Sequence, residues 1–148
     1  MMNNQKIKKI ILAEDNLADV ELTRLAFADL SLPIELVHVN DGQELLNYLD
    51  SAELSEIALV LLDLNMPRIG GIEILKMMYD DDEYKKLPMV VLSSSLHQAD
   101  VVTCYEYGAN AYVNKPIDIN DFNVVIAAIA NFWVEINLLP VFNTTKVS

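Results

Sequence analysis

The chain is poor in cysteine, in glycine and proline, and in basic residues. Its single cysteine, Cys104, excludes an internal disulfide and a zinc site built from cysteines. Only 4 glycines and 5 prolines occur in 148 residues, and no linker or low-complexity segment is visible. Lysine and arginine number 10 against 22 acidic residues. The resulting net charge of −12 argues against nucleic-acid binding, because phosphate backbones select basic surfaces.

A long hydrophobic run is missing near the start of the chain. The first apolar run, residues 10–13, is short and ends at Glu14 and Asp15 without a cleavage-like segment. We therefore expect no signal peptide, a cytoplasmic location and no membrane partner. What the chain does have is 53% apolar residues, enough for one domain with a sizeable core. We expect a single domain over 1–148, with its core at about 7–137 and a short tail, 138–148.

Short apolar runs alternate with helical patterns along the whole chain. The runs predict five strands, most of them buried on both faces, at residues 8–13, 34–39, 58–62, 89–92 and 111–113. The stretches after them predict helices near residues 17–29, 43–49, 72–79, 100–107 and 121–137. Asn16 is expected to cap the first helix, Asp41 and Gly42 to open the second, and Gly108 to close the fourth. Five strand–helix repeats favour an α/β fold with a parallel sheet covered by helices on both faces.

Polar side chains follow four of the predicted strands. Glu14 and Asp15 come after the first strand, Asp63 after the third, Ser93 after the fourth and Lys115 after the fifth. In an open parallel sheet these carboxyl ends share one edge, and ligands bind where the strand order reverses. We adopt the order 2-1-3-4-5 from known five-stranded sheets of this kind, which makes the first and third strands neighbours. Glu14, Asp15 and Asp63 are therefore expected to lie side by side.

Three adjacent carboxylates repel one another unless a hard cation neutralises them. Mg2+, or Mn2+ in its place, suits such a site, because it takes one or two carboxylates and leaves positions for water and phosphate oxygens. Lys115 adds a compact positive charge that can pair with Asp63 or with a phosphate, and Ser93 adds a hydroxyl. A carboxylate nucleophile, a metal site, an ammonium group and a hydroxyl are the parts needed to accept a phosphoryl group.

Four stretches of the sequence resemble the receiver domain of two-component response regulators. They are ILAEDN, LVLLDLNMPRIGG, VVLSSS and GANAYVNKP, at residues 11–16, 59–71, 90–95 and 108–116. They follow the order and spacing of that family across nearly the whole chain. The resemblance implies a flavodoxin-like receiver fold that accepts a phosphoryl group from a sensor histidine kinase in a magnesium-dependent reaction. It also implies no conventional enzyme activity, only self-catalysed phosphorylation and loss of the phosphate.

The same resemblance implies roles for residues after the first and third strands. Asp63 would be the phospho-acceptor. Glu14 and Asp15 would bind the metal, together with Asp63 and the backbone carbonyl of Asn65. Asn65 and Ser95 occupy positions that tune the access of water in this family, and with it the rate of dephosphorylation.

Residues at the ends of the fourth and fifth strands would form the switch. Lys115 would pair with the phosphate, and Ser93 would turn its hydroxyl toward it. Tyr112 matches the aromatic residue that changes rotamer in step with Ser93. The bond between Lys115 and Pro116 matches one that is usually cis in this family.

The fourth helix, fifth strand and fifth helix would form the output surface, which signals through protein contacts. Val101 and Tyr105 fall on one helical face, four residues apart. The last helix is apolar almost all round, includes Phe132 and Trp133, and is expected to be too short and too interrupted to span a bilayer. We expect a second copy to cover it in a two-fold dimer. The alternative is that the tail from Leu138 folds back over it.

The motifs EDNLADVELT, VVLSSS and NFW are similar to those of stand-alone regulators that partner phytochrome-type histidine kinases. Three alternatives to this function remain. A flavin or small-molecule carrier on the same fold would want a loop rich in Gly, Ser and Thr where this chain has Glu14 and Asp15. An aspartyl-intermediate phosphatase would want an aspartate where Asn65 stands. A receiver-like module that is never phosphorylated would not need the complete set of site residues.

Overall fold

Five parallel strands pair in the order β2-β1-β3-β4-β5 in a computed structural model, which describes residues 6–142. The strands are β1 (Lys8–Ala13), β2 (Ile34–Val39), β3 (Ile57–Leu62), β4 (Met89–Ser93) and β5 (Ala111–Asn114). The α-helices are α1 (Leu17–Ala28), α2 (Gly42–Ser51), α3 (Gly71–Tyr79), α4 (Gln98–Glu106) and α5 (Ile119–Ala130). The predicted α/β class and strand order are confirmed, and the strand bounds agree with the prediction to within one residue.

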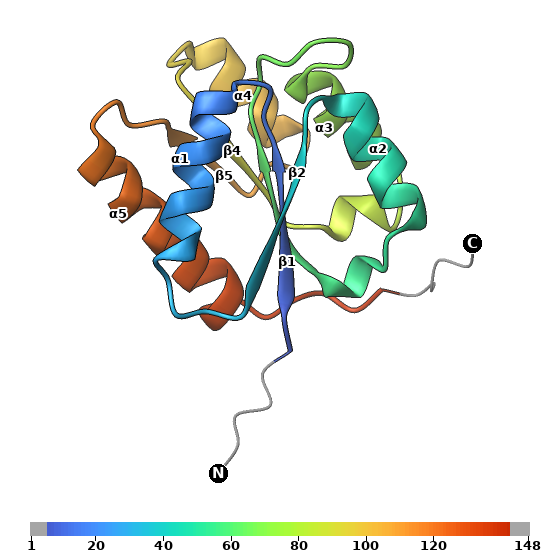
Figure 1. Ribbon diagram of the computed structural model, residues 1–148. Helices are drawn as coiled ribbons and strands as arrows, with labels where there is room; N and C mark the ends of the chain where they lie inside the picture. Colours follow the sequence, from blue (N-terminus) through green and yellow to red (C-terminus); the bar gives the residue numbers. More distant parts are fainter. Residues whose placement is uncertain (1–5, 143–148) are drawn as a thin grey trace.

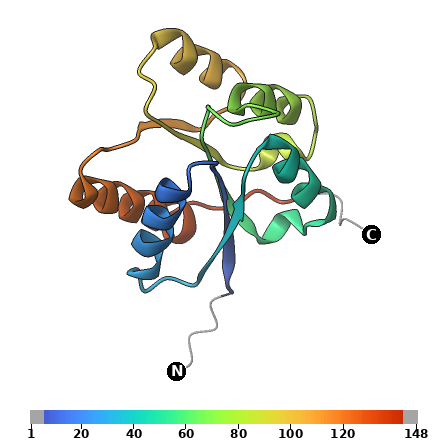
Figure 2. The same ribbon diagram turned by 45° about the horizontal axis from the view of Figure 1, so that its top comes forward.

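Helices cover both faces of the sheet (Figures 1 and 2). α1 and α5 lie side by side on one face, and α2, α3 and α4 cover the other. Because side chains alternate along a strand, β1 sends Ile10 and Leu12 to the α1–α5 face and Ile11 and Ala13 to the opposite face. Each face therefore has its own apolar core. β3 lies in the centre of the sheet and is buried at every residue. Its uninterrupted apolar run suits a strand that is covered on both faces.

The predicted helix caps are present. The side chain of Asn16 accepts a hydrogen bond from the Asp19 amide and caps α1, and the Asp41 side chain accepts one from the Glu44 amide and caps α2. Gly108 follows α4 with a φ of +89°, a backbone conformation that glycine adopts without steric cost. These local signals set where the helices begin and end, and so where the loops at the carboxyl edge start.

The last predicted helix, 121–137, differs from the structure. α5 ends at Ala130, and a π-helical segment, η3 (Asn131–Ile136), continues it. The amide of Asn137 donates to the carbonyl of Phe132 at 2.7 Å, a span of five residues that widens the turn. The apolar pattern predicted a helix here, but it did not reveal the change in hydrogen bonding.

The stretch Ile119–Ile136 is 18 residues long with a mean hydropathy of 1.3, so by length and composition alone it could cross a membrane. The expectation that it is too short to do so is therefore wrong. Phe122, Ile126 and Ile129 on one side of α5 pack into the core against the sheet. Core helices commonly pass the same test, so hydropathy alone says little about a membrane here.

The chain after η3 runs along the amino edge of the sheet toward the α2 side (Figure 1). Leu139 packs against the α1–α5 core, and Phe142 packs against the core on the other face. Phe132 and Ile136 remain exposed. Residues 138–142 therefore leave Phe132 and Ile136 uncovered, and residues 143–148 lie outside the described part of the chain, so the alternative in which the tail covers the last helix stays a prediction.

Candidate functional site

Hydrogen bonds that continue the strand ladders place two acidic residues at neighbouring strand tips. The amide of Glu14, just after β1, donates to the carbonyl of Val39 in β2 at 3.1 Å. The amide of Asp63, just after β3, donates to the carbonyl of Ala13 in β1 at 3.0 Å. Because β1 lies between β2 and β3, these bonds bring Glu14 and Asp63 together at the carboxyl edge of the sheet.

Glu14, Asp15 and Asp63 form one acidic cluster, as expected. Each offers a carboxylate oxygen, and the three oxygens lie within 4.8 Å of one another. Glu14 and Asp63 are buried, whereas Asp15 is exposed at the rim. Carboxylate oxygens are the ligands that Mg2+ and Mn2+ prefer, and an open rim leaves positions for water. The donor set therefore fits a hard divalent cation.

The buried member of the cluster, Glu14, has a strongly perturbed acidity. Burial raises the pKa of Glu14 to about 7; the hydrogen bond from Lys115 opposes this rise, and the charge of Asp63 adds to it. The Glu14 carboxylate also accepts from the Asn16 amide at 3.3 Å. Its backbone carbonyl is hydrogen-bonded to Nε2 of His38 at 2.7 Å. A bound cation would favour the charged form of this carboxylate.

Lys115 reaches the cluster from the tip of β5, where its amide donates to the carbonyl of Ser93 at 2.9 Å. Its Nζ donates to Oε1 of Glu14 at 2.7 Å and to Oδ2 of Asp19 at 2.9 Å. Burial by itself would lower the pKa of Lys115, but these two hydrogen bonds raise it above its ordinary value. Of the two partners considered for Lys115, Asp63 and a phosphate, Asp63 is not bonded to it here, and two other carboxylates hold the ammonium group.

Asp19 is a site residue that the sequence interpretation missed. It lies in the first turn of α1, directly beside the carboxyl edge of the sheet. An acidic residue in the first turn of a helix that starts at this edge was the available signal. That signal is weak, because acidic residues are common in first turns, where they interact favourably with the helix dipole.

Ser93, Ser95 and Tyr112 form a connected group beside the cluster. Ser93 is fully buried, and its Oγ accepts from the Ser95 amide at 3.1 Å. The Tyr112 hydroxyl donates to the Ser95 carbonyl at 2.8 Å, and Oγ of Ser95 donates to Oδ2 of Asp100 in α4 at 2.8 Å. The two residues expected to switch together are thus joined through Ser95, whose own hydroxyl is turned to α4.

The loop between β3 and α3 is tied to α2 by an ion pair that the sequence interpretation also missed. Nε and Nη2 of Arg68 donate to Oδ2 of Asp41 at 2.9 and 2.6 Å. The Glu44 amide and the Arg68 guanidinium hold the pKa of Asp41 below its usual range. Arg68 has a φ of +63°, and no other non-glycine residue within 6–142 has a positive φ. Asn65 is exposed in this loop, and metal binding by its carbonyl stays a prediction.

Two glycines allow the helices to approach this loop closely. A Cβ atom on Gly71 would lie 2.6 Å from the carbonyl oxygen of Asp63, and one on Gly42 would lie 2.5 Å from that of Ile69. The Gly42 amide donates to the same Ile69 carbonyl at 3.2 Å. The start of α3 therefore packs closely against the beginning of this loop, at Asp63, and the start of α2 packs against its end, at Ile69.

The bond between Lys115 and Pro116 is trans, since the described residues contain no cis peptide bond. The expected cis bond is therefore wrong. A surface cavity of about 570 Å³ opens beside these residues, between Ser94 and Leu96 on one side and Ile117 on the other.

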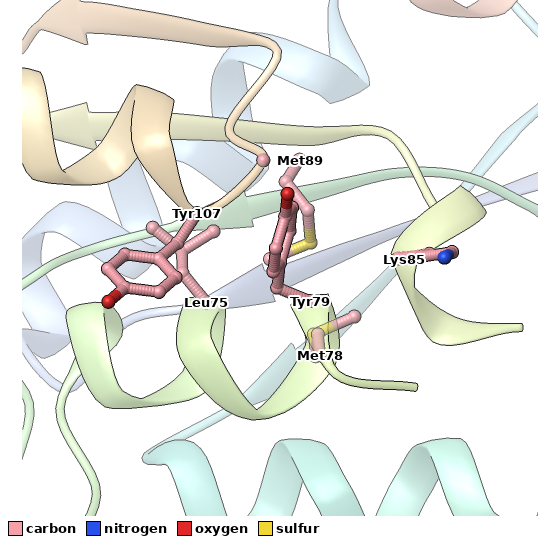
Figure 3. Close-up of a pocket in the computed structure, with 7 residues that line it drawn as sticks. Leu75, Met78, Tyr79, Lys85, Met89 and Tyr107 are labelled. Atoms are coloured by element: carbon pink, nitrogen blue, oxygen red, sulfur yellow. The ribbon is translucent and has the colours of Figure 1, made fainter. Parts of the chain in front are cut away.

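A smaller cavity lies at the amino end of β4, at the opposite edge of the sheet from the acidic cluster. Tyr79 and Tyr107 line it edge to face, with ring centroids 5.9 Å apart, together with Leu75, Met78 and Met89 (Figure 3). Its volume of about 20 Å³ holds about one water molecule. This space is too small for a flavin.

The predicted partner-surface residues differ in exposure. The side chains of Tyr105 and Phe132 are 52% and 45% exposed, whereas Val101 is half-buried. Trp133 packs against the α1–α5 core and meets the ring of Phe132 edge to face at 4.9 Å. Trp133 is therefore partly a core residue, and a dimer through this surface stays a prediction.

Comparisons with known proteins agree with this fold. The family model described as response regulator receiver domain matches residues 10–127. The response regulator Rcp1 of Synechocystis sp. is 32% identical over 137 residues, which are 90% of this chain and 93% of the relative. The crystal structure of the phosphorylated cyanobacterial phytochrome response regulator RcpA is similar with a TM-score of 0.83 and 36% identity, over 90% of this chain and 99% of that one. The Mn2+-bound form of Rcp1 gives a TM-score of 0.82 at 32% identity with the same coverage.

Proposed function

The chain belongs to the response regulator receiver domain family, and on that premise we propose that it accepts a phosphoryl group from a sensor histidine kinase onto Asp63. The observation that carries this proposal is the acidic cluster, in which the oxygens of Glu14, Asp15 and Asp63 lie within 4.8 Å of one another and Lys115 bonds one member. A buried carboxylate beside an ammonium group is suited to attack phosphorus.

In the proposed transfer, an Asp63 oxygen forms a bond to phosphorus while the phosphorus–nitrogen bond of the kinase phosphohistidine breaks and the imidazole leaves. Lys115 donates to the phosphoryl oxygens and Ser93 supplies a hydroxyl. A Mg2+ or Mn2+ ion held by Glu14, Asp15, Asp63 and the Asn65 carbonyl would supply charge neutralisation when bound. The phosphoryl group is later lost by hydrolysis: water attacks phosphorus, the bond to the Asp63 oxygen breaks, and inorganic phosphate leaves.

Phosphorylation replaces the single negative charge of the Asp63 carboxylate with about two on the phosphoryl group, next to the group formed by Ser93, Ser95 and Tyr112. We propose that this charge draws the loop after β4 inward, that Tyr112 changes rotamer with it, and that the α4–β5–α5 surface then signals through protein contacts. Ser95 and Asn65 would tune the lifetime of the phosphate. Beyond its own phosphorylation and dephosphorylation, the proposal includes no enzyme activity.

The proposed phosphodonor is a phytochrome-type histidine kinase. Support comes from RcpA, described as a cyanobacterial phytochrome response regulator, which is similar along 99% of its length. The Mn2+-bound form of Rcp1 supports the choice of metal. A cytoplasmic location and a homodimer through Tyr105 and Phe132 complete the proposal; nucleic acid and membrane are not proposed as partners.

Intact-mass measurement after incubation with phosphoramidate and Mg2+ tests the function. We expect one phosphoryl group on the wild type and none on Asp63→Asn. Asp82→Asn is the matched control, because its side chain is 98% exposed in a charged loop, and it should be labelled like the wild type. Labelling of Asp63→Asn at the wild-type rate, or equal labelling in chelator, would contradict the proposal. A wild type that is never labelled would favour the non-phosphorylated alternative.

A further inference from the structure

The carboxylate of Asp19 has no role in capping the helix that contains it. Asn16 caps α1 and accepts from the Asp19 amide at 3.1 Å. The Asp19 carbonyl accepts from the Thr23 hydroxyl at 2.7 Å, so the backbone of Asp19 serves the helix. Its carboxylate makes one contact to another element, the 2.9 Å ion pair with Lys115.

The Lys115 ammonium group has three N–H donors, and two carboxylates occupy two of them. Glu14 is itself a member of the acidic cluster, whereas Asp19 lies outside it, in the first turn of α1. The side chain of Lys115 is 13% exposed and that of Asp19 27%, so water screens this pair only in part. The third N–H is left for a phosphoryl group on Asp63, and the attraction of the two carboxylates opposes any movement of Nζ toward that group.

We propose that Asp19 is a positioning residue that holds Lys115 in a resting position and opposes its movement to the phosphoryl group. This inference rests on the proposed function, which makes Asp63 the acceptor. Asp19 is not a member of the acidic cluster, which includes the acceptor Asp63, and the proposed effect of its carboxylate is exerted through Lys115. The interaction of Lys115 with the phosphoryl group must therefore be strong enough to compensate for the loss of the ion pair with Asp19.

The inference predicts a gain where a structural role predicts a loss. Asp19→Asn keeps a side chain of nearly the same shape and both backbone hydrogen bonds of α1, but it removes the charge that attracts Lys115. We expect Asp19→Asn to bind beryllofluoride, a phosphoryl mimic, about five-fold more tightly than the wild type at fixed Mg2+, in line with the usual strength of a partly exposed ion pair. If Asp19 only stabilised the fold by joining α1 to Lys115, Asp19→Asn would bind beryllofluoride more weakly and melt at a lower temperature.

Three controls separate the ion pair from a general effect of charge. Glu21→Gln removes one exposed acidic group from the same helix, away from Lys115, and should bind like the wild type. Asp19→Glu keeps the charge and should restore wild-type affinity. In a Lys115→Gln background, Asp19→Asn should give no gain. A five-fold gain in that background, or in Glu21→Gln, would overturn the inference.

A second readout does not depend on phosphoryl binding. The 13C chemical shift of Lys115 Cε in the metal-free protein should differ between the wild type and Asp19→Asn, and Asp19→Glu should return it toward the wild type. An unchanged shift would show that Asp19 does not hold Lys115. A wild type that binds no beryllofluoride would instead count against the proposed function, while the shift would still report on Asp19.

Discussion

Arg68 donates two hydrogen bonds to a single oxygen of Asp41, at 2.9 and 2.6 Å, and joins the loop after β3 to the start of α2. The other oxygen of Asp41 accepts from the Glu44 amide at 2.9 Å. One buried carboxylate therefore caps a helix and holds a loop. The ion pair therefore joins α2 to the loop that directly follows Asp63.

Arg68 has a left-handed backbone conformation, which is unfavourable for a residue with a Cβ atom. Its φ of +63° costs a non-glycine residue about 1 kcal/mol. Arg68→Ala and Arg68→Gly both lose the ion pair, but only glycine relieves the strain. We expect both variants to be less stable than the wild type in urea unfolding, with Arg68→Gly about 1 kcal/mol more stable than Arg68→Ala. Equal stability of the two variants would show that the backbone is not strained there.

Asp41→Asn tests the charge of the ion pair separately from the helix cap, because asparagine caps helices as well as aspartate does. The folded-state pKa of Asp41 lies below its ordinary value near 3.8. Its charge therefore contributes stability that is present above that value and is lost as the pH falls through the lower folded pKa. We expect the wild type to be more stable than Asp41→Asn in urea at pH 7, with the difference closing below about pH 4. A difference that is the same at pH 7 and pH 3 would contradict this.

Gly71 and Gly70 form a matched pair at the start of α3. A Cβ atom on Gly71 would meet two backbone atoms, the Asp63 carbonyl oxygen at 2.6 Å and the Leu64 Cα at 2.8 Å, whereas the nearest atom to a Cβ on Gly70 is the Leu64 carbonyl oxygen at 3.4 Å. We expect Gly71→Ala to lower the free energy of unfolding by about 2 kcal/mol or more and to reduce phosphorylation. Gly70→Ala should stay close to the wild type in both measurements. Similar losses in the two variants would show that close approach to Asp63 is not the cause.

Mg2+ should stabilise the wild type far more than Asp63→Asn. In the metal-free protein Asp63 repels Glu14 and Asp15, so Asp63→Asn should have the higher Tm. Ligand at ten times its Kd adds about 1.4 kcal/mol to the stability of a protein that binds it only when folded. Thermal scans with and without Mg2+ should therefore show a clear rise in the wild type and a small one in Asp63→Asn. Equal rises would place metal binding elsewhere.

Tyr105 and Phe132 carry the prediction about oligomeric state. Both are exposed apolar residues on elements of the proposed output surface, whereas Trp133 is partly in the core. We expect sedimentation velocity at micromolar concentration to show a dimer, and Phe132→Glu to convert it to a monomer that remains folded. Leu25→Glu, at an exposed position of α1 outside this surface, is the control and should leave the dimer intact. A wild type that is monomeric with and without phosphate would remove the dimer from the proposed function.

Local patterns in the sequence determined the elements and their order. The bounds of β1 and β2, the capping roles of Asn16 and Asp41, and the turn at Gly108 follow from apolar runs and side-chain chemistry within a few residues. Parallel strands also bring Glu14 and Asp63 to one edge of the sheet, but their meeting was expected only because the strand order 2-1-3-4-5 was adopted from known sheets.

Only the tertiary structure decided which groups bond at that edge. Lys115 and Glu14 are 101 residues apart, and Arg68 and Asp41 are 27 apart, so no local pattern links them. Whether the ammonium of Lys115 meets Asp63 or Asp19 depends on the direction and reach of each side chain once the strands and α1 have packed. The trans bond at Pro116 and the π-helical turn of η3 were likewise not revealed by the sequence pattern. Hydrophobic periodicity and strand order predict where the backbone runs. A hydrogen bond forms only when donor and acceptor lie about 3 Å apart, so the partners of each side chain are known only from the folded structure.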